Sequence, residues 1–227
     1  MKNFKFGFTI AEVATALAIV GIIAALVMPL VVKNVQKQQA GPMLGRAVQQ
    51  IELGCMNLVQ YANSNVIDGS HWDSLADITF KDIVGDSASS EKLFSDNVNF
   101  IKLLAPYIGA VKVDIDWNKM PVIKNFDGSN GSLLIVNTMI KTGETYKFNN
   151  TQTELSIANY LGTITDTKWV FIDVNGWNRP PNTFGKDIFE FDWVNSSCKL
   201  KPYAPNVTNG LQYTKQIVND GFKIKYY

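Results

Sequence analysis

Histidine and the residue patterns of common catalytic sites are scarce in this sequence. The single histidine, His71, stands beside Trp72 with no second histidine to complete a metal site. No G-x-S-x-G, H-E-x-x-H or P-loop pattern occurs along the 227 residues. We therefore predict that the protein is not an enzyme.

An excess of charge of either sign is also lacking, since 21 Lys and Arg residues stand against 20 Asp and Glu residues. Domains that bind nucleic acid usually carry a clear basic excess. The even balance therefore predicts no nucleic-acid partner.

Residues 8–32 form the one long apolar run of the chain. Of these 25 residues, 20 are Ala, Val, Ile, Leu, Met or Phe, and Glu12 carries the only charge. As a helix the run would be about 37 Å long, enough to cross a hydrocarbon core of about 30 Å. Lys2 and Lys5 precede it, so the positive-inside rule places the N-terminus in the cytoplasm and the remaining chain outside.

Glu12 separates three interpretations of this run. A cleaved secretory signal would have a shorter apolar core without a carboxylate, and a plain anchor would explain the length but not the charge. A carboxylate within a membrane is costly unless it finds a partner, which marks it as functional. If the chain is cut after Gly7, the α-amine of Phe8 lies about one helical turn from Glu12 and can pair with it, within one chain or between neighbours.

The same residues match a known family. The order Gly7-Phe8-Thr9-Ile10-Ala11-Glu12, followed by an apolar run with Gly21 and Pro29, resembles the N-terminus of type IV pilins and type II secretion pseudopilins. The match covers about the first 30 residues of the chain. It departs mildly at Ala11, Ala14 and Ala16, where bulkier aliphatic residues are common in the family.

The resemblance implies a helix that occupies two environments in succession. A prepilin peptidase would cleave after Gly7 and methylate Phe8, while the chain spans the bacterial inner membrane once with its head in the periplasm or outside the cell. An inner-membrane assembly platform would then move the helix into a filament of pilin or pseudopilin subunits, where Glu12 sets the register. The sequence leaves open a minor tip pilin whose head binds surfaces, secreted substrates or DNA. Abundance in sheared filaments would separate the two roles.

The chain beyond the apolar run predicts one head domain of the α+β class. Residues 1–7 would be a leader, 8–32 the membrane or filament-core helix, 33–62 its continuation on the head, and 63–227 the head itself, with a kink or break expected at Gly41-Pro42. Alternation predicts strands at 111–115, 168–174 and 187–194, the aromatic residues of the last on one buried face. Further expectations are helical pieces at 74–84, 89–105 and 210–219, a hairpin turn at 127–131 between 122–126 and 132–140, and an edge strand at 222–226.

The segment between the two clearest strands carries a candidate metal site. Asp173, Asn175 and Asp187 offer the hard oxygens that calcium prefers. The resemblance adds weight, because pseudopilins often hold calcium in a loop near the end of the sheet. Against it, the spacing does not match an EF-hand, and Arg179 and Lys186 stand among the ligands. The alternative is a structured loop whose Asp and Asn side chains bond their own backbone.

Cys55 and Cys198 are the only cysteines. In a domain placed outside the cytoplasm, an even count predicts a disulfide, which here would fasten the C-terminal region to the long helix. The alternative is that Cys55 is a small core residue on the apolar face of the helix and Cys198 a free thiol.

Overall fold

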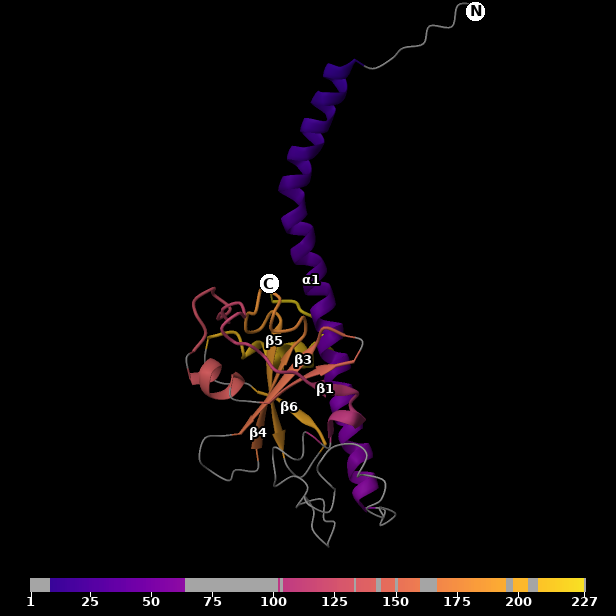
Figure 1. The fold of residues 1–227 in the computed structure, drawn as a ribbon, viewed down its shortest axis with the longest axis vertical. Helices are drawn as coiled ribbons and strands as arrows, with labels where there is room; N and C mark the ends of the chain where they lie inside the picture. The colour runs from indigo at the N-terminus through magenta and orange to yellow at the C-terminus, as the bar shows by residue number, and fades with distance from the viewer. Residues whose placement is uncertain are drawn as a thin grey trace, which may run out of the picture. The chain divides into compact units, whose positions relative to one another are not determined.

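The computed structural model describes residues 9–63, 102, 104–132, 134–141, 144–149, 151–159, 167–194, 198–203 and 208–226 (Figure 1). The chain divides into two compact units, Met1–Gln39 and Ala40–Tyr227. One α-helix, α1 (Ile10–Asn63), contributes residues to both units. The helical piece expected at 74–84 lies outside the described residues, as do His71 and the leader. Of the piece expected at 89–105, residues 102, 104 and 105 are described and are helical, and the helix continues through Pro106 to residue 107 instead of ending before the proline.

The first unit consists, in its described part, of the apolar half of α1. Every described side chain from Ile10 to Val32 is exposed, and α1 is the described helix that is long and apolar enough to cross a membrane. Pro29 and Gly41-Pro42 lie inside α1 without ending it. The expected break at Gly41-Pro42 is therefore wrong. The helix continues through both residues, and the absence of a side chain at Gly41 allows the backbone of Phe222 to pack against it.

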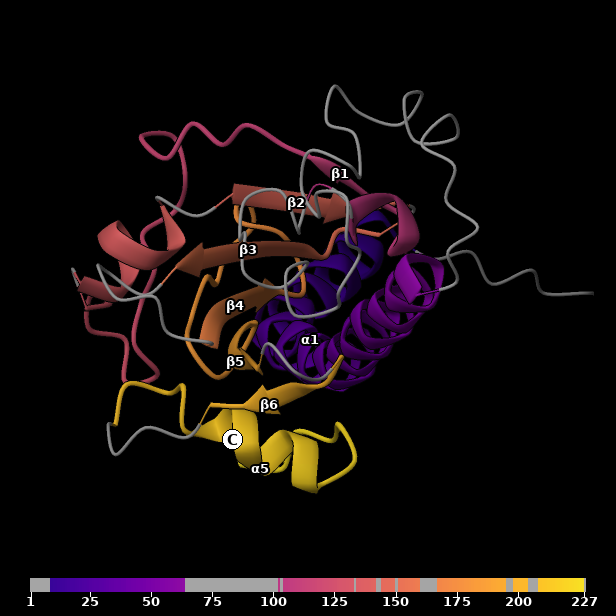
Figure 2. The same cartoon turned by 90° about the horizontal axis from the view of Figure 1, so that it is seen from below.

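The second unit contains a six-stranded antiparallel sheet with strands in chain order, β1-β2-β3-β4-β5-β6 (Figure 2). The strands are β1 (Ala110–Lys112), β2 (Glu144–Phe148), β3 (Glu154–Asn159), β4 (Thr167–Asp173), β5 (Ile188–Val194) and β6 (Leu200–Pro202). With the long helix, this arrangement is α+β, as the sequence predicts. The strands expected at 168–174 and 187–194 are confirmed as β4 and β5.

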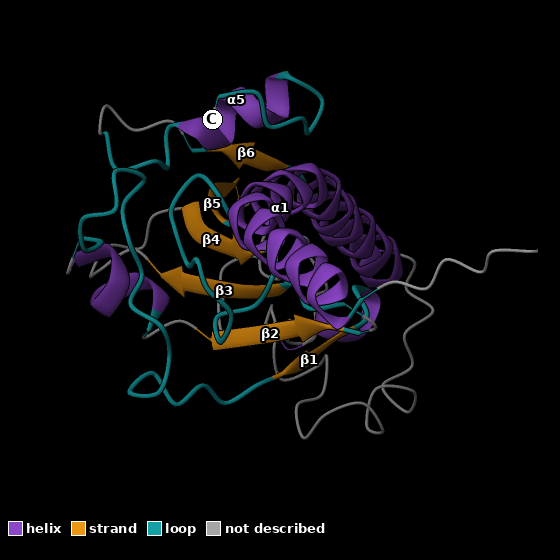
Figure 3. Cartoon of the chain, turned by 90° about the horizontal axis from the view of Figure 1, so that it is seen from above, coloured by secondary structure: helices purple, strands orange, loops and turns teal. Residues whose placement is uncertain are grey.

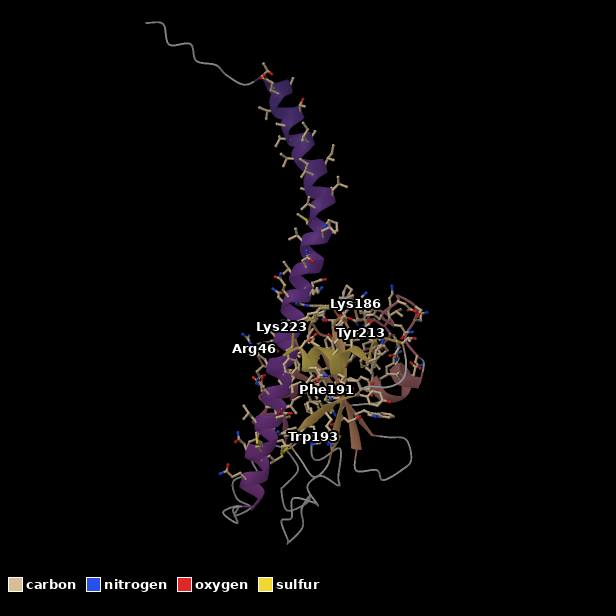
Figure 4. All side chains as sticks on the ribbon, turned by 180° about the vertical axis from the view of Figure 1, so that it is seen from behind. Arg46, Lys186, Phe191, Trp193, Tyr213 and Lys223 are labelled. Carbon is tan, nitrogen blue, oxygen red and sulfur yellow. A yellow bond between two sulfur atoms is a disulfide. The ribbon has the colours of Figure 1, made fainter. Side chains whose placement is uncertain are left out.

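One face of the sheet packs on residues 40–58 of α1 (Figure 3). The helix supplies Leu44, Ile51 and Leu58 at helical spacing, and all three are almost fully buried. The sheet supplies the aromatic residues of β5, Phe189, Phe191 and Trp193, which alternate along the strand and join the same cluster (Figure 4). The expected buried aromatic face is confirmed.

The opposite face of the sheet is covered as well, by loops and by a short π-helix, η2 (Leu134–Ile140). Val136 and Ile140, four residues apart, are buried in a second core cluster with Phe171 and Trp177. The hairpin partner expected at 132–140 is therefore wrong, because these apolar residues repeat at helical spacing. Glu190 of β5 is buried on this side, and burial raises its pKa to about 8.

The C-terminal region agrees in part with the elements predicted from the sequence. The helix α5 (Tyr213–Asn219) confirms the expected helix at 210–219, and it packs beside β5 and β6. Residues 222–226 are not a strand, because their described backbone groups join no ladder. The strand expected at 111–115 is limited to β1, which ends at Lys112.

A disulfide joins Cys55 of α1 to Cys198, just before β6, which confirms the predicted pairing. The two cysteines are 143 residues apart in the chain. Next to the bridge, the backbone N–H of Leu200 donates to Oε1 of Glu52 at 3.0 Å. The C-terminal part of the head is thus fastened to the helix by one covalent and one polar link.

Replacing both cysteines with alanine should lower the free energy of unfolding of the full chain. Closing a loop of 143 residues contributes up to about 5 kcal/mol in the chain-entropy description. Denaturant unfolding in detergent micelles measures the change, and Glu52→Gln, which weakens only the neighbouring hydrogen bond, serves as the control. Two thiols that alkylate in unreduced, denatured protein would contradict the bridge.

Candidate functional site

The N-terminus of α1 is closed by reciprocal hydrogen bonds between Thr9 and Glu12. The backbone N–H and the hydroxyl of Thr9 donate to Oε2 of Glu12 at 2.8 and 2.9 Å, and the backbone N–H of Glu12 donates to Oγ1 of Thr9 at 3.2 Å. This is a capping box, in which a threonine and a glutamate three residues later satisfy each other's free N–H groups. The carboxylate of Glu12 therefore caps the N-terminus of its own helix as well as carrying a charge.

The T-x-x-E pattern could have been found in the sequence, where residues 9–12 read Thr-Ile-Ala-Glu. The proposed partner of Glu12, the amine of Phe8, lies outside the described residues, as does Gly7. Processing at Gly7 and pairing of Glu12 with Phe8 therefore stay predictions.

A second site lies in the segment from the last residue of β4 to the start of β5, residues 173–187, which we name the carboxylate loop. Asp173 ends β4 and Asp187 directly precedes β5. In the sheet register Asp173 lies opposite Glu154 of β3 on one side and Ile188 on the other. The antiparallel pairing thus brings three acidic side chains to one end of the sheet, and all three are at most 5% exposed.

Each of these carboxylates accepts hydrogen bonds from the loop backbone. Oδ1 of Asp173 accepts from the N–H groups of residues 175 and 176 at 3.0 and 2.9 Å. The two oxygens of Asp187 accept from the N–H groups of residues 182 and 183, at 2.8 and 2.6 Å. Glu154 accepts from the N–H of residue 177 at 3.0 Å. The carboxylates therefore shape the loop around themselves.

Burial and mutual repulsion act against the negative charges. The pKa of Asp173 is raised well above its ordinary value, first by burial and then by the charge of Asp187. The pKa of Asp187 is raised to about 6, chiefly by burial, although the loop N–H groups oppose the shift. Arg179 is exposed, and Nζ of Lys186 lies 4.9 Å from the ring centre of Phe126. The carboxylate loop thus gathers negative charge in a poorly solvated place.

Three further oxygens of the loop are buried without a hydrogen-bond partner among the described residues. They are Oδ2 of Asp173, Oδ1 of Asn175 and Oδ1 of Asn182. Carboxylate and amide oxygens are the ligands of a hard cation such as calcium. In the described part of the chain no three His, Cys, Asp or Glu side chains form a metal group by themselves. Amide, backbone or water oxygens would have to complete a calcium shell.

The structure therefore places the three predicted ligands, Asp173, Asn175 and Asp187, in one loop and adds two residues to them. Glu154 was missed because only strand register brings it opposite Asp173. Asn182 was missed because its role depends on a loop conformation with φ of 43° that follows two prolines. No family model matches the chain, and neither a curated protein nor a solved structure matches it, so the sites are interpreted from their own chemistry.

Changing Asp173 to Asn should stabilise the metal-free protein at high pH. A raised native pKa means that the native state holds its proton more tightly, so stability declines as pH rises from about 4 through that pKa. The amide keeps the acceptor for residues 175 and 176 and removes one buried charge, so we expect the unfolding free energy to rise at pH 8 and to change less at pH 5.

Unfolding of the full chain in chelator at pH 5 and pH 8 measures this effect. Asp116→Asn, which alters an exposed carboxylate paired with Lys119, is the matched control. Equal destabilisation by Asp173→Asn at both pH values would show that the charge itself is not the cause.

Proposed function

We propose that the protein is a structural subunit of a type IV pilus or of a type II secretion pseudopilus. In this role it is held first in the inner membrane by the apolar half of α1, is cleaved after Gly7 by a prepilin peptidase, and is then built into a filament. The observation that carries the proposal is a helix whose apolar half is exposed all round and whose first turn carries Glu12 in a capping box with Thr9.

An exposed apolar surface of this length requires an apolar partner. Large aliphatic residues on every side of the helix, such as Leu17, Ile22 and Leu26, are more than half exposed. Water does not stabilise such a surface, whereas lipid tails or the apolar helices of other subunits do. The two partners correspond to the two stages of the proposed function, membrane insertion and filament assembly.

The capping box gives Glu12 a structural role before assembly, at the N-terminus of α1. The negative charge that it keeps is available for a second role, pairing with a cation during assembly. Hydrogen bonds from Thr9 come from neutral donors, so they satisfy the carboxylate without removing its charge. In a medium of low dielectric constant, the remaining charge is strongly attracted to a cation. The α-amine that cleavage creates at Phe8 is that cation in our proposal, supplied by a neighbouring subunit in the filament.

The proposed orientation of the chain across the membrane is supported more by the disulfide than by the distribution of basic residues around the apolar run. Lys33 and Lys37 follow the apolar run just as Lys2 and Lys5 precede it, so basic residues flank both ends. A disulfide persists in an oxidising compartment such as the periplasm and is rare in the cytosol. We therefore place the head, with its Cys55–Cys198 bridge, outside the cytoplasm.

The charge and the cap of Glu12 can be separated by substitution. Glu12→Gln keeps a side chain that can close a capping box but removes the charge, and Thr9→Val removes the cap hydroxyl but keeps the charge. We expect Glu12→Gln to abolish incorporation into filaments and Thr9→Val to reduce it only mildly. Sheared-filament immunoblots measure incorporation, and membrane fractionation with the size of the processed chain serves as the control for insertion and cleavage.

The opposite ranking would show that helix capping, rather than pairing with an amine, is what assembly needs. Normal incorporation of Glu12→Gln would contradict the proposed role of the charge. Glu12→Ala removes both properties and should fail to assemble while it is still inserted and cleaved.

We further propose that the carboxylate loop holds a calcium ion through Asp173, Asn175 and Asp187, with Asn182 contributing an oxygen and Glu154 contributing charge. Calcium should raise the melting temperature of the full chain by several degrees relative to chelator, and magnesium should do so much less. The rise should shrink at pH 5, because protons then compete for a carboxyl whose pKa is about 6. Identical melting in calcium and chelator at pH 8 would eliminate the ion.

A further inference from the structure

We propose that residues 220–226 form a clasp that couples the carboxylate loop to helix α1. The segment follows α5 and contacts α1 at Phe222 and the carboxylate loop at Tyr226. The inference extends the proposed calcium site to its regulation, but the coupling itself requires no ion.

At the helix end, the clasp lies directly on two glycines of α1. A Cβ at Gly41 would overlap the carbonyl of Phe222, and a Cβ at Gly45 would lie 3.0 Å from the Phe222 ring. The absence of side chains at these two positions, four residues apart on one face of the helix, allows the backbone of the clasp to approach. Ala40, next to Gly41, is buried, so this contact lies within the head.

At the loop end, the clasp is fixed by a hydrogen bond and by ring stacking. The hydroxyl of Tyr226 donates to the carbonyl of Gly185 at 2.6 Å, two residues before Asp187. The Tyr226 ring stacks on Tyr213 of α5, with ring centres 4.1 Å apart and planes within 6°. A Cβ at Gly185 would lie 2.5 Å from the carbonyl of Gly210, so the loop backbone is tightly enclosed here.

Between these ends the clasp is short and internally bonded. The N–H of Phe222 donates to the carbonyl of Ile217 at 2.7 Å, and Lys225 pairs with Asp220 at 3.0 Å. Figure 4 shows Lys223 of the clasp beside α1, with Tyr213 and Lys186 toward the same end of the head. A shift of the loop at Gly185 is therefore carried through few bonds to Gly41.

The carboxylate loop has a reason to shift. The two oxygens of Asp187 accept from the N–H groups of residues 182 and 183, two to three residues before Gly185. A cation bound at Asp187 would therefore act on the same stretch of loop backbone that Tyr226 holds at Gly185. The clasp converts that local change into a change in how firmly the first turn of α1 within the head is held.

Hydrogen–deuterium exchange of the full chain in detergent micelles tests the coupling without added metal. Gly41→Ala displaces the clasp from the helix, and we expect the amides of residues 182–187 to exchange several-fold faster while those of β3 and β4 keep their protection. Gly21→Ala is the matched control, because a Cβ at Gly21 meets nothing within 4 Å. Its exchange should equal that of the unmodified chain.

The reciprocal variant is Tyr226→Phe, which removes the bond to Gly185 and keeps the stacked ring. It should speed exchange in residues 40–46, whereas Lys225→Ala, which removes only the surface ion pair, should not. Changes confined to the element that carries each substitution would overturn the coupling, and so would a uniform rise that includes β4 and β5. Coupling in a protein that does not bind calcium would leave the clasp intact and remove only the calcium proposal.

Discussion

The packing of residues 40–58 of α1 against the aromatic face of the sheet is the contact on which the head depends. Leu44, Ile51 and Leu58 belong to one core cluster with Phe191 and Trp193, and burial of side chains of this size contributes roughly 2 kcal/mol each. The disulfide, the Glu52–Leu200 bond and the clasp all fasten other parts of the head to this same stretch of helix. Because these links converge on one stretch of α1, a substitution there disturbs the core and the C-terminal region together.

Sequence patterns predict this contact correctly where one hydrophobic periodicity, that of a strand or that of a helix, dominates the segment. The alternation in β5 and the helical spacing in the second half of α1 each identify the correct face, and the disulfide is predicted from an even cysteine count in a domain that the sequence is expected to place outside the cytoplasm. The patterns fail where tertiary packing decides. Residues 134–140 have strand-like composition but bury Val136 and Ile140 as a helical turn, and Pro42 stays within a helix whose following residues, such as Leu44, are buried in the head. Glu154 joins the candidate site through register alone, which no local pattern reveals.

Burial of side chains stabilises the core, whereas burial of the acidic side chains in the carboxylate loop is destabilising. Burying three acidic side chains is unfavourable, and hydrogen bonds to loop N–H groups offset only part of that cost. The buried oxygens of Asp173, Asn175 and Asn182, which have no hydrogen-bond partner in the described part of the chain, mark the part of the cost that is not offset. A fold that is otherwise well packed would gain by replacing such groups with apolar ones, so their presence favours a functional explanation, which a bound cation would provide.

The glycines of α1 differ in their packing between the two halves of the helix. Gly41, Gly45 and Gly54 each lie against another part of the head, where a methyl group would meet Phe222 or Ile108. A Cβ at Gly21 would meet nothing within 4 Å among the described residues, although glycine within a helix costs about 1 kcal/mol relative to alanine. Packing within the head accounts for Gly41, Gly45 and Gly54, whereas no contact in the described part of the chain accounts for Gly21. A glycine that weakens its own helix without such a contact is consistent with close approach by another helix, as the proposed filament requires.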